Sequence, residues 1–233
     1  MFEKEQKGLT HIAQQGIIKV PEVIASATID DHQLLLLEWI PTGEKKEVFW
    51  RKFGEQLAAL HHCSSACFGL EYDNYMGSVP QLNTMQISWV DFFIHKRLRP
   101  LVDKCFKKEL LQPKHIPLFE KLYTQLPNLF NHEPPALLHG DLWSGNYLCN
   151  ANSEPVLIDP AIYYGHRSVD MGMTTLFGGF QRPFYEAYQY HYPLPRNYAE
   201  QWEVCNLYPL LIHLLLFGQG YLSSINKTLK AFQ

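Results

Sequence analysis

Apolar positions near the start of the chain change from a helical to a strand-like spacing. The first apolar residues recur at helical intervals among charges, and Gly16 follows them, so the pattern predicts a short amphipathic helix over residues 2–15. Residues 23–29 and 34–40 are instead continuous runs of apolar and β-branched residues, separated by a turn at 30–32. These runs predict a β-hairpin whose second strand is buried.

From residue 47 onward the apolar spacing is mostly helical. The predicted helices cover residues 47–62, 87–104, 115–130, 167–178, 182–191, 197–217 and 219–231. Between residues 136 and 159 this spacing is interrupted by short apolar stretches at 136–138, 147–149 and 155–158, joined by polar loops. The chain is therefore expected to be an α+β protein in which a small β insert lies inside a mainly helical domain.

The β insert carries three side chains that offer oxygen atoms. Asp141 and Asn146 lie in the loop after the first stretch, and Asp159 ends the last one. Such side chains suit a hard cation such as Mg²⁺, and a carboxylate can also accept a proton. Strand ends and the loops between them hold side chains in fixed positions, which is where functional groups are commonly placed.

The spacing of these residues is typical of a phosphotransferase. In protein kinases an aspartate of the catalytic loop orients the acceptor hydroxyl, an asparagine five residues later holds Mg²⁺, and a second aspartate further on chelates the metal. Asp141 is then the base, and Asn146 and Asp159 are the metal ligands. The alternative is that Asp141 and Asn146 only cap turns, but the flanking apolar strands and the position of Asp159 favour catalysis.

Composition narrows the range of partners and compartments. The 233 residues carry 20 Lys+Arg and 23 Asp+Glu, a formal net charge of −3, and show no basic stretch suited to nucleic acid. An odd number of cysteines, five, and a charged N-terminus without an apolar leader favour a reduced, cytoplasmic protein. The most apolar segment, residues 207–217, is about half as long as the ~20 residues of a membrane span.

The strand over residues 34–40 is interpreted as the end of a small nucleotide-binding lobe. Its last residues then form a linker whose Glu38 carbonyl and Ile40 amide hydrogen-bond the adenine of ATP. The alternative is an ordinary buried strand. We accordingly predict two domains, with residues 1–40 as the remainder of the nucleotide lobe and linker, and residues 41–233 as the helical catalytic lobe.

Longer motifs extend the comparison to a specific family. They are Phe2-x-x-Glu5-x-x-Gly8-Leu9, Leu57-Ala58-Ala59-Leu60-His61, Asn74 to Thr84, Trp89-Val90-Asp91-Phe92-Phe93, His139 to Asn146, Leu157 to Ala161, Tyr164 to Asp170 and Tyr208-Pro209-Leu210-Leu211. Over essentially all 233 residues the chain closely resembles the fructosamine kinases, or ketosamine 3-kinases, which are relatives of the aminoglycoside phosphotransferases within the protein-kinase-like fold.

The resemblance implies an activity and roles for further residues. It implies ATP-dependent phosphorylation, with Mg²⁺, of the sugar 3-hydroxyl of free ketosamines or glycated protein amines; the unstable product then releases the amine, which amounts to deglycation. Trp143 is then a stacking face for the sugar or its amine-bearing arm, the alternative being a core indole. Asn83 is placed near the acceptor, the alternative being an ordinary turn. Asp170 resembles the aspartate that braces the catalytic loop.

The sequence departs from the family pattern at its start. The family places a phosphate-covering loop and a lysine-bearing strand before the helix whose glutamate, here Glu5, pairs with that lysine, whereas this chain begins at that helix. Neither Gly-x-Gly-x-x-Gly nor Gly-x4-Gly-Lys-[Ser/Thr] occurs, and Lys19 follows the helix and is expected to be structural or solvated. We expect an N-terminally truncated family member with severely lowered activity, or a lobe that a partner chain completes.

Two other functions stay open at this point. One is a catalytically silent remnant that binds a sugar-amine or a protein, and the other is a phosphotransferase acting on aminoglycosides or small amines. A soft-metal site at residues 61–67, which contain two histidines and two cysteines, is disfavoured because no second ligand pair follows at a suitable spacing.

Overall fold

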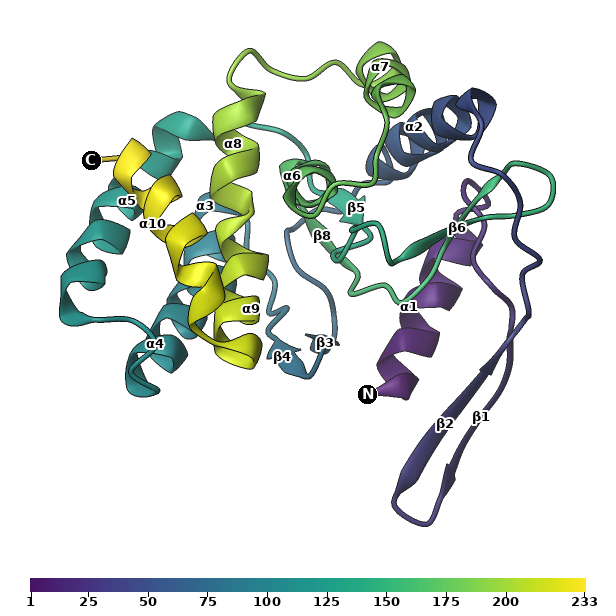
Figure 1. Ribbon diagram of the computed structural model, residues 1–233, viewed down its shortest axis with the longest axis horizontal. Coiled ribbons are helices and arrows are strands. Elements are labelled where there is room, and N and C mark those ends of the chain that lie inside the picture. Colours follow the sequence, from purple (N-terminus) through teal and green to yellow (C-terminus); the bar gives the residue numbers. More distant parts are fainter.

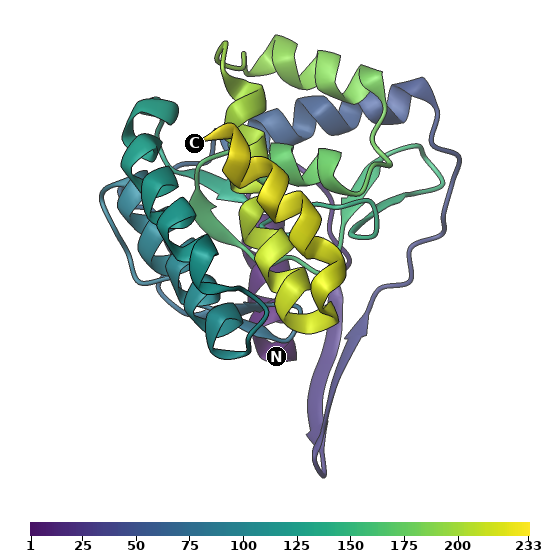
Figure 2. The same cartoon turned by 60° about the vertical axis from the view of Figure 1, so that its left-hand side comes forward.

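The N-terminal segment is one helix followed by a projecting hairpin. The computed structural model describes residues 1–233. Helix α1 (Phe2–Gln14) packs on the rest of the chain, and strands β1 (Val23–Ile29) and β2 (His32–Leu37) pair antiparallel. Both views show this hairpin extending away from the remainder of the molecule (Figures 1 and 2).

The second strand of the hairpin is exposed, so the expectation of a buried strand was wrong. Leu34 and Leu36 are 49% and 56% exposed. Successive residues of a strand point to opposite faces, and α1 is the principal element beside this ribbon. A run of leucines therefore does not by itself show that a strand is covered.

Most of the remaining chain is helical. The helices are α2 (Glu47–His61), α3 (Trp89–Phe92), a π-helix (Phe93–Leu98), α4 (Arg99–Lys107), a 3₁₀ turn (Pro113–His115), α5 (Ile116–Leu129), α6 (Ser168–Leu176), α7 (Arg182–His191), α8 (Tyr198–Cys205), α9 (Leu207–Phe217), a second 3₁₀ turn (Gln219–Tyr221) and α10 (Leu222–Ala231). The positions of α2, α5 and α7 confirm the sequence-based predictions.

Short two-stranded sheets hold the loops between these helices. Their strands are β3 (Asn74–Met76), β4 (Val79–Gln81), β5 (Ala136–Leu138), β6 (Tyr147–Cys149), β7 (Pro155–Leu157) and β8 (Tyr163–Gly165). The antiparallel pairs are β3 with β4, β5 with β8, and β6 with β7. The β insert is thus confirmed. Strand β8 lies beyond the predicted insert and was not predicted, because a run of three residues is too short to show strand periodicity.

The helix predicted over residues 197–217 divides into α8 and α9. Pro209 lies in the first turn of α9 and has no N–H to donate to the carbonyl four residues earlier, that of Cys205. The predicted helix therefore exists as two shorter ones with a break at residue 206.

The helix predicted over residues 87–104 is interrupted by the π-helix. Pro100 cannot donate to the Lys96 carbonyl, and the side chain of Arg97 donates to that oxygen instead, at 3.2 Å. The local widening of the helix accompanies this change of partner.

A single apolar core joins the helices to the β insert. It contains 52 buried residues, among them Ile12 and Ile18 from the N-terminal segment, so α1 and the chain after it share this core. The division at residue 40 stays a prediction. No helix is both long enough and apolar enough to span a bilayer.

The packing of α2 on α7 depends on Gly54. A Cβ at this position would lie 2.2 Å from the Phe184 carbonyl oxygen and 2.9 Å from the Tyr188 nitrogen, both of which are backbone atoms. Backbone atoms cannot move aside as a flexible side chain can, so the two helices lie this close only because residue 54 has no side chain.

We predict that Gly54→Ala destabilises the protein although alanine favours helices. Overpacking of the α2–α7 contact should lower the free energy of unfolding by about 2 kcal/mol, which lowers the melting temperature by roughly 4–8 °C. The matched control is Gly220→Ala, because a Cβ at position 220 meets nothing within 4 Å. Equal melting temperatures for the two variants would contradict the prediction.

Candidate active site

The loop that follows β5 is fixed by the buried carboxylate of Asp170. This side chain of α6 accepts hydrogen bonds from the backbone N–H groups of His139, at 2.7 Å, and Gly140, at 2.9 Å. Asp170 is 0% exposed, and a buried carboxylate is tolerated only when donors surround it. The resemblance implied such a bracing role for Asp170, and its contacts in the structure agree with that role.

A third donor to Asp170 comes from α2. His61 is buried, and its Nε2 donates to Asp170 Oδ2 at 3.2 Å while its Nδ1 accepts from the hydroxyl of Tyr188 on α7 at 2.7 Å. Burial lowers the pKa of His61, although Asp170 opposes the shift. Burial thus disfavours the charged ring, and in the neutral ring the proton lies on the nitrogen that faces the carboxylate, because an ionised carboxylate can only accept.

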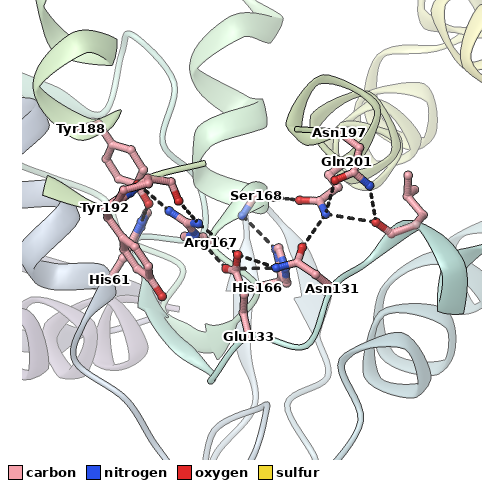
Figure 3. Close-up of polar contacts among 12 residues, drawn as sticks. His61, Asn131, Glu133, His166, Arg167, Ser168, Tyr188, Tyr192, Asn197 and Gln201 are labelled. Atoms are coloured by element: carbon pink, nitrogen blue, oxygen red, sulfur yellow. Dashed lines mark hydrogen bonds and ion pairs between the residues drawn. The ribbon is translucent and has the colours of Figure 1, made fainter. Parts of the chain in front are cut away.

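The hydrogen-bond network around Asp170 extends to an ion pair at the start of α6. Figure 3 shows the guanidinium of Arg167 donating through two nitrogens, Nε and Nη2, to the Glu133 carboxylate at 2.8 and 3.0 Å. Arg167 also donates to the Tyr192 carbonyl at 2.8 Å. These contacts tie the start of α6 to the end of α7 and to the segment before β5, so Asp170 is mounted on a fixed helix.

Gly140 allows the loop to approach the segment after Asp159. Its φ of 85° lies in the region that favours glycine, and a Cβ there would be 2.1 Å from the Ala161 carbonyl oxygen. His139 bridges the same two segments, since its Nε2 donates to the Ile158 carbonyl at 2.9 Å and its own carbonyl accepts from Ala161 N at 2.9 Å.

Asp141 and Asn146 are joined directly. The side-chain nitrogen of Asn146 donates to the Asp141 carbonyl at 2.9 Å and to the Asp141 carboxylate oxygen Oδ2 at 3.1 Å. The backbone N–H of Asp141 donates to His139 Nδ1 at 3.3 Å. These contacts fix the carboxylate of Asp141 while Oδ1 of Asn146 accepts no hydrogen bond.

Asp159 has an unusual backbone held from the preceding strand. Its φ is 50°, a left-handed conformation that a residue other than glycine adopts only when neighbouring contacts enforce it. The preceding amides are both engaged: Ile158 N donates to Asn146 O at 3.1 Å, and Leu157 N donates to Lys19 O at 2.8 Å. Lys19 thus contacts this site through its backbone.

The carboxylates of the site interact with one another. Burial, followed by repulsion from Asp159, raises the pKa of Asp141 to about 7, and the hydrogen bond from Asn146 only partly opposes this. Burial and Asp159 likewise raise the pKa of Glu5 to about 7. The site therefore holds more negative charge than its own residues neutralise, which favours the binding of a cation.

The donor set fits a hard cation such as Mg²⁺. Neither the carboxylate of Asp159 nor Oδ1 of Asn146 takes part in a hydrogen bond within the chain, and oxygen atoms are the ligands that Mg²⁺ prefers. No group of three or more His, Cys, Asp or Glu side chains is placed to hold a metal. A cation at Asn146 and Asp159 would thus complete its shell with water and phosphate oxygens, as Mg²⁺ commonly does.

An exposed aromatic residue follows Asp141 in the same loop. The indole of Trp143 is 39% exposed and meets the ring of Phe177 edge to face at 6.2 Å. A Cβ at Gly145 would lie 2.3 Å from the same indole, so glycine lets the ring lie flat on the loop. Trp143 is therefore not a core indole.

The residues that the sequence predicted to contact the nucleotide lie at two separate places in the structure. Glu5 and Asp159 both line a small cavity of about 70 Å³ between α1 and β3. Glu38 is exposed at the end of β2, where its N–H donates to the Glu22 carbonyl at 2.8 Å. The carbonyl of Glu38 and the amide of Ile40 make no hydrogen bond within the chain, so both stay free for the predicted adenine contact.

Asn83 does not have the expected position. It is 0% exposed; its Nδ2 donates to Tyr72 O and Asn74 Oδ1, and its Oδ1 accepts from Arg97 at 2.7 Å. No polar atom of the side chain remains for an acceptor, which overturns the expected contact with substrate. The sequence left a place near the acceptor or an ordinary turn as the options for Asn83, whereas its amide bonds to a backbone carbonyl, another amide and an arginine inside the fold.

Comparison with known proteins identifies the family. A model of the fructosamine kinases matches residues 1–232. The chain belongs to the fructosamine kinase family. A relative named probable ketoamine kinase, from Lactiplantibacillus plantarum, is 38% identical over 99% of this chain and 81% of its own length. The chloroplastic protein-ribulosamine 3-kinase of Arabidopsis thaliana is 35% identical over 96% of this chain and 69% of its own length.

Solved structures agree with this membership. The crystal structure of a protein assigned as a fructosamine-3-kinase from Thermobifida fusca matches the whole chain and 80% of its own length, with a TM-score of 0.90 and 33% identity. The aminoglycoside phosphotransferase APH(2'')-Ib has a TM-score of 0.60 at 14% identity and covers 97% of this chain and 81% of its own, which shows the protein-kinase-like fold shared with those enzymes. As a fructosamine kinase family member, the chain is a kinase.

The raised pKa of Asp141 predicts a pH-dependent effect of Asp141→Asn in a solution containing EDTA. The folded-state pKa of about 7 exceeds the unfolded value of about 3.9. Ionisation therefore destabilises the folded wild type as the pH rises between these values. The difference in melting temperature, variant minus wild type, should therefore increase by about 3 °C or more from pH 5 to pH 8.

The control for this measurement is Asp103→Asn, which changes an exposed carboxyl on α4. Its melting temperature should follow that of the wild type at both pH values. A constant difference between Asp141→Asn and the wild type would contradict the raised pKa.

Proposed function

We propose that this chain transfers the γ-phosphoryl group of ATP to the sugar 3-hydroxyl of ketosamines, either free or borne on protein amines. The observation that carries the proposal is that Asp141, Asn146 and Asp159 meet on one strand-loop-strand unit beside the exposed indole of Trp143. Membership of the fructosamine kinase family supports the same activity, as do relatives named for ketoamines and ribulosamines.

In the proposed reaction the chain supplies a base and a fixed geometry. The acceptor oxygen attacks the γ-phosphorus and its proton passes to the Asp141 carboxylate, while the bond from the γ-phosphorus to the bridging oxygen breaks and leaves ADP. Asn146 keeps the carboxylate in place through its 3.1 Å hydrogen bond. The backbone anchors on Asp170 prevent the loop from retreating as the acceptor approaches.

Asn146 and Asp159 are the proposed ligands of Mg²⁺. A cation bound there would neutralise negative charge on the phosphates of ATP. The free oxygen atoms of both side chains support this role, as does the repulsion that raises the pKa of the neighbouring Asp141 and Glu5. A bound cation would lower the pKa of Asp141, so the base would be ionised at neutral pH.

The nucleotide is proposed to contact the segment after β2. The free carbonyl of Glu38 and the free amide of Ile40 support hydrogen bonds to adenine, and Glu5 is proposed to belong to the phosphate side because it faces Asp159. A partner chain that completes the lobe around the exposed β1–β2 hairpin stays a prediction.

The ketosamine acceptor is supported by the aromatic surface next to the base. A ketosamine carries an amine close to its 3-hydroxyl, and a protonated amine is attracted to the face of an indole. Trp143 lies two residues beyond Asp141 in the same loop, and the rest of the acceptor is proposed to lie over this ring. Phosphate on the 3-hydroxyl is a good leaving group: its elimination breaks the C3–O bond and releases phosphate, and water then hydrolyses the resulting imine and frees the amine, which accounts for deglycation.

We predict release of ADP when the 233-residue chain is incubated with ATP, Mg²⁺ and a ribulosamine. Asp141→Asn should reduce this turnover by about 100-fold or more because the proton has no acceptor. The measurement is a coupled ADP assay on proteins whose circular dichroism shows that they are folded. Asp103→Asn, which alters an exposed carboxyl of α4, should leave turnover unchanged.

The substrate panel separates the proposed function from its alternatives. Turnover with aminoglycosides but not with ketosamines would replace the proposal with the aminoglycoside alternative. Folded protein that binds a ribulosamine without releasing ADP would indicate the silent binding module. Equal turnover by the wild type and Asp141→Asn would show that Asp141 is not the base.

We also predict that Trp143→Ala weakens the binding of the acceptor and leaves the binding of the nucleotide unchanged. Loss of the aromatic face should raise KM for the ribulosamine about 10-fold and leave KM for ATP unchanged. Phe106→Ala is the control, because this ring on α4 has similar exposure, 41% against 39%. Equal effects on the two KM values would show that Trp143 supports the loop instead of binding the acceptor.

A further inference from the structure

Two buried amide side chains face each other across the β3–β4 hairpin. Asn74 and Gln81 are cross-strand partners and are 4% and 1% exposed. Gln81 Nε2 donates to Asn74 Oδ1 at 2.8 Å. The hairpin lies beside α1 (Figure 1), and neither amide is used in the proposed transfer. Buried amides without such partners would be strongly destabilising.

The remaining donors of both amides are directed at the backbone that follows Asp159. Gln81 Nε2 donates to the Ala161 carbonyl at 3.0 Å, and Asn74 Nδ2 donates to the Ile162 carbonyl at 2.8 Å. The hairpin therefore holds two successive carbonyl groups that begin two residues beyond the proposed metal ligand.

The hairpin is itself anchored to the helical part. Tyr208 on α9 donates its hydroxyl proton to Gln81 Oε1 at 2.8 Å. Asn83, just after β4, donates to Asn74 Oδ1 and accepts from Arg97, whose guanidinium lies 3.9 Å from the centre of the Tyr163 ring. Arg97 is 0% exposed and forms no ion pair, so amide oxygens, carbonyls and aromatic faces stabilise its charge.

These contacts explain how Asp159 keeps a left-handed backbone. Its φ of 50° requires support on both sides. The preceding strand supplies one side through Ile158 N and Asn146 O. On the other side, Ala161 is held at its N–H by the carbonyl of His139 and at its carbonyl by Gln81.

We propose that Gln81 and Asn74 are positioning residues that hold the segment after Asp159, and thereby aim the Asp159 carboxylate at the cation. The inference rests on the proposed function only for the identity of the cation. The positioning itself is a property of the backbone and can be measured without turnover.

The chain offers a closely matched control in Gln201. This buried glutamine donates to the Leu129 carbonyl at 3.1 Å and to Asn131 Oδ1 at 2.8 Å, and it accepts from the Ser168 hydroxyl at 2.9 Å. Figure 3 shows these contacts, which connect α8 with the end of α5 and the start of α6, and none of them reaches residues 159–163. Gln81 and Gln201 thus each contact a carbonyl, an asparagine oxygen and a hydroxyl, and Gln201 makes one further, long contact with Asn197 Oδ1 at 3.5 Å.

The experiment compares Gln81→Met with Gln201→Met in the full chain. Methionine has a similar length and no strong hydrogen-bond donor, so both variants lose one set of bonds. Amide hydrogen exchange followed by mass spectrometry should show exchange at residues 159–163 about 10-fold faster in Gln81→Met only. Electron paramagnetic resonance with Mn²⁺ alone should show affinity lowered about 10–100-fold in the same variant.

The outcomes separate this inference from the proposed function. Unchanged exchange at residues 159–163 in Gln81→Met, or faster exchange with unchanged Mn²⁺ affinity, would overturn the positioning role. Equal changes in both variants would also overturn it, because they would reflect general destabilisation. A wild type that binds no Mn²⁺ would instead contradict the proposed metal ligands, while the exchange data would still decide whether Gln81 holds the segment.

Tyr208→Phe gives a milder second variant should Gln81→Met fold poorly. It removes only the hydroxyl that donates to Gln81 Oε1 and keeps the ring that packs in the core. Its exchange at residues 159–163 should accelerate less than 10-fold, by about 3-fold. If turnover is measurable, KM for Mg²⁺ should rise in both variants while KM for the ribulosamine stays constant. Unchanged exchange in Tyr208→Phe, or equal rises in both KM values, would overturn the inference.

Discussion

The active-site geometry depends on one buried carboxylate that is fully surrounded by donors. Asp170 has no access to solvent and receives hydrogen bonds from two successive backbone amides and from His61. Removing one of these donors would leave part of the buried charge without a partner, which destabilises a protein interior. The conformation of the loop before Asp141 is therefore tied to the stability of α2 and α6.

The two halves of the site are linked to each other as well as to this carboxylate. His139 bonds to Ile158 and Ala161 on either side of Asp159, and Asn146 bonds to Ile158 while holding Asp141. The proposed base and the proposed metal ligand are thus positioned by a shared set of backbone contacts. A displacement of either segment would shift both. The position of Asp141 relative to Asp159 is therefore better defined than the position of either residue relative to the exposed β1–β2 hairpin.

Sequence patterns predicted those features that depend on local spacing. The amphipathic helices α2, α5 and α7 follow from apolar periodicity, and the unit with Asp141, Asn146 and Asp159 follows from motif spacing within a β insert. The burial of β2 and the substrate contact of Asn83 were predicted wrongly, because each depends on which distant element covers the residue. The Leu34 run lacks a covering element, whereas Asn83 is enclosed by Arg97, 14 residues away in sequence.

His61, Asn74 and Gln81 were missed as supporting residues for a related reason. Their partners are separated from them by 80 to 127 residues along the chain. The signal available in the sequence was the position of His61 at the end of an apolar helix, and the density of amides between residues 74 and 83. Neither pattern indicates which distant group will be contacted, because a hydrogen bond across the fold leaves no periodicity in either segment.

The two buried histidines have a consequence for how the site responds to acidity. Burial lowers the pKa of both His61 and His139, so neither ring accepts a proton as readily as an exposed histidine does. Burial and the neighbouring Asp159 have the opposite sense for the reactive group, because they raise the pKa of Asp141. The residues that hold the loop thus resist protonation, whereas the carboxylate that they hold gains a proton more readily than an ordinary aspartate.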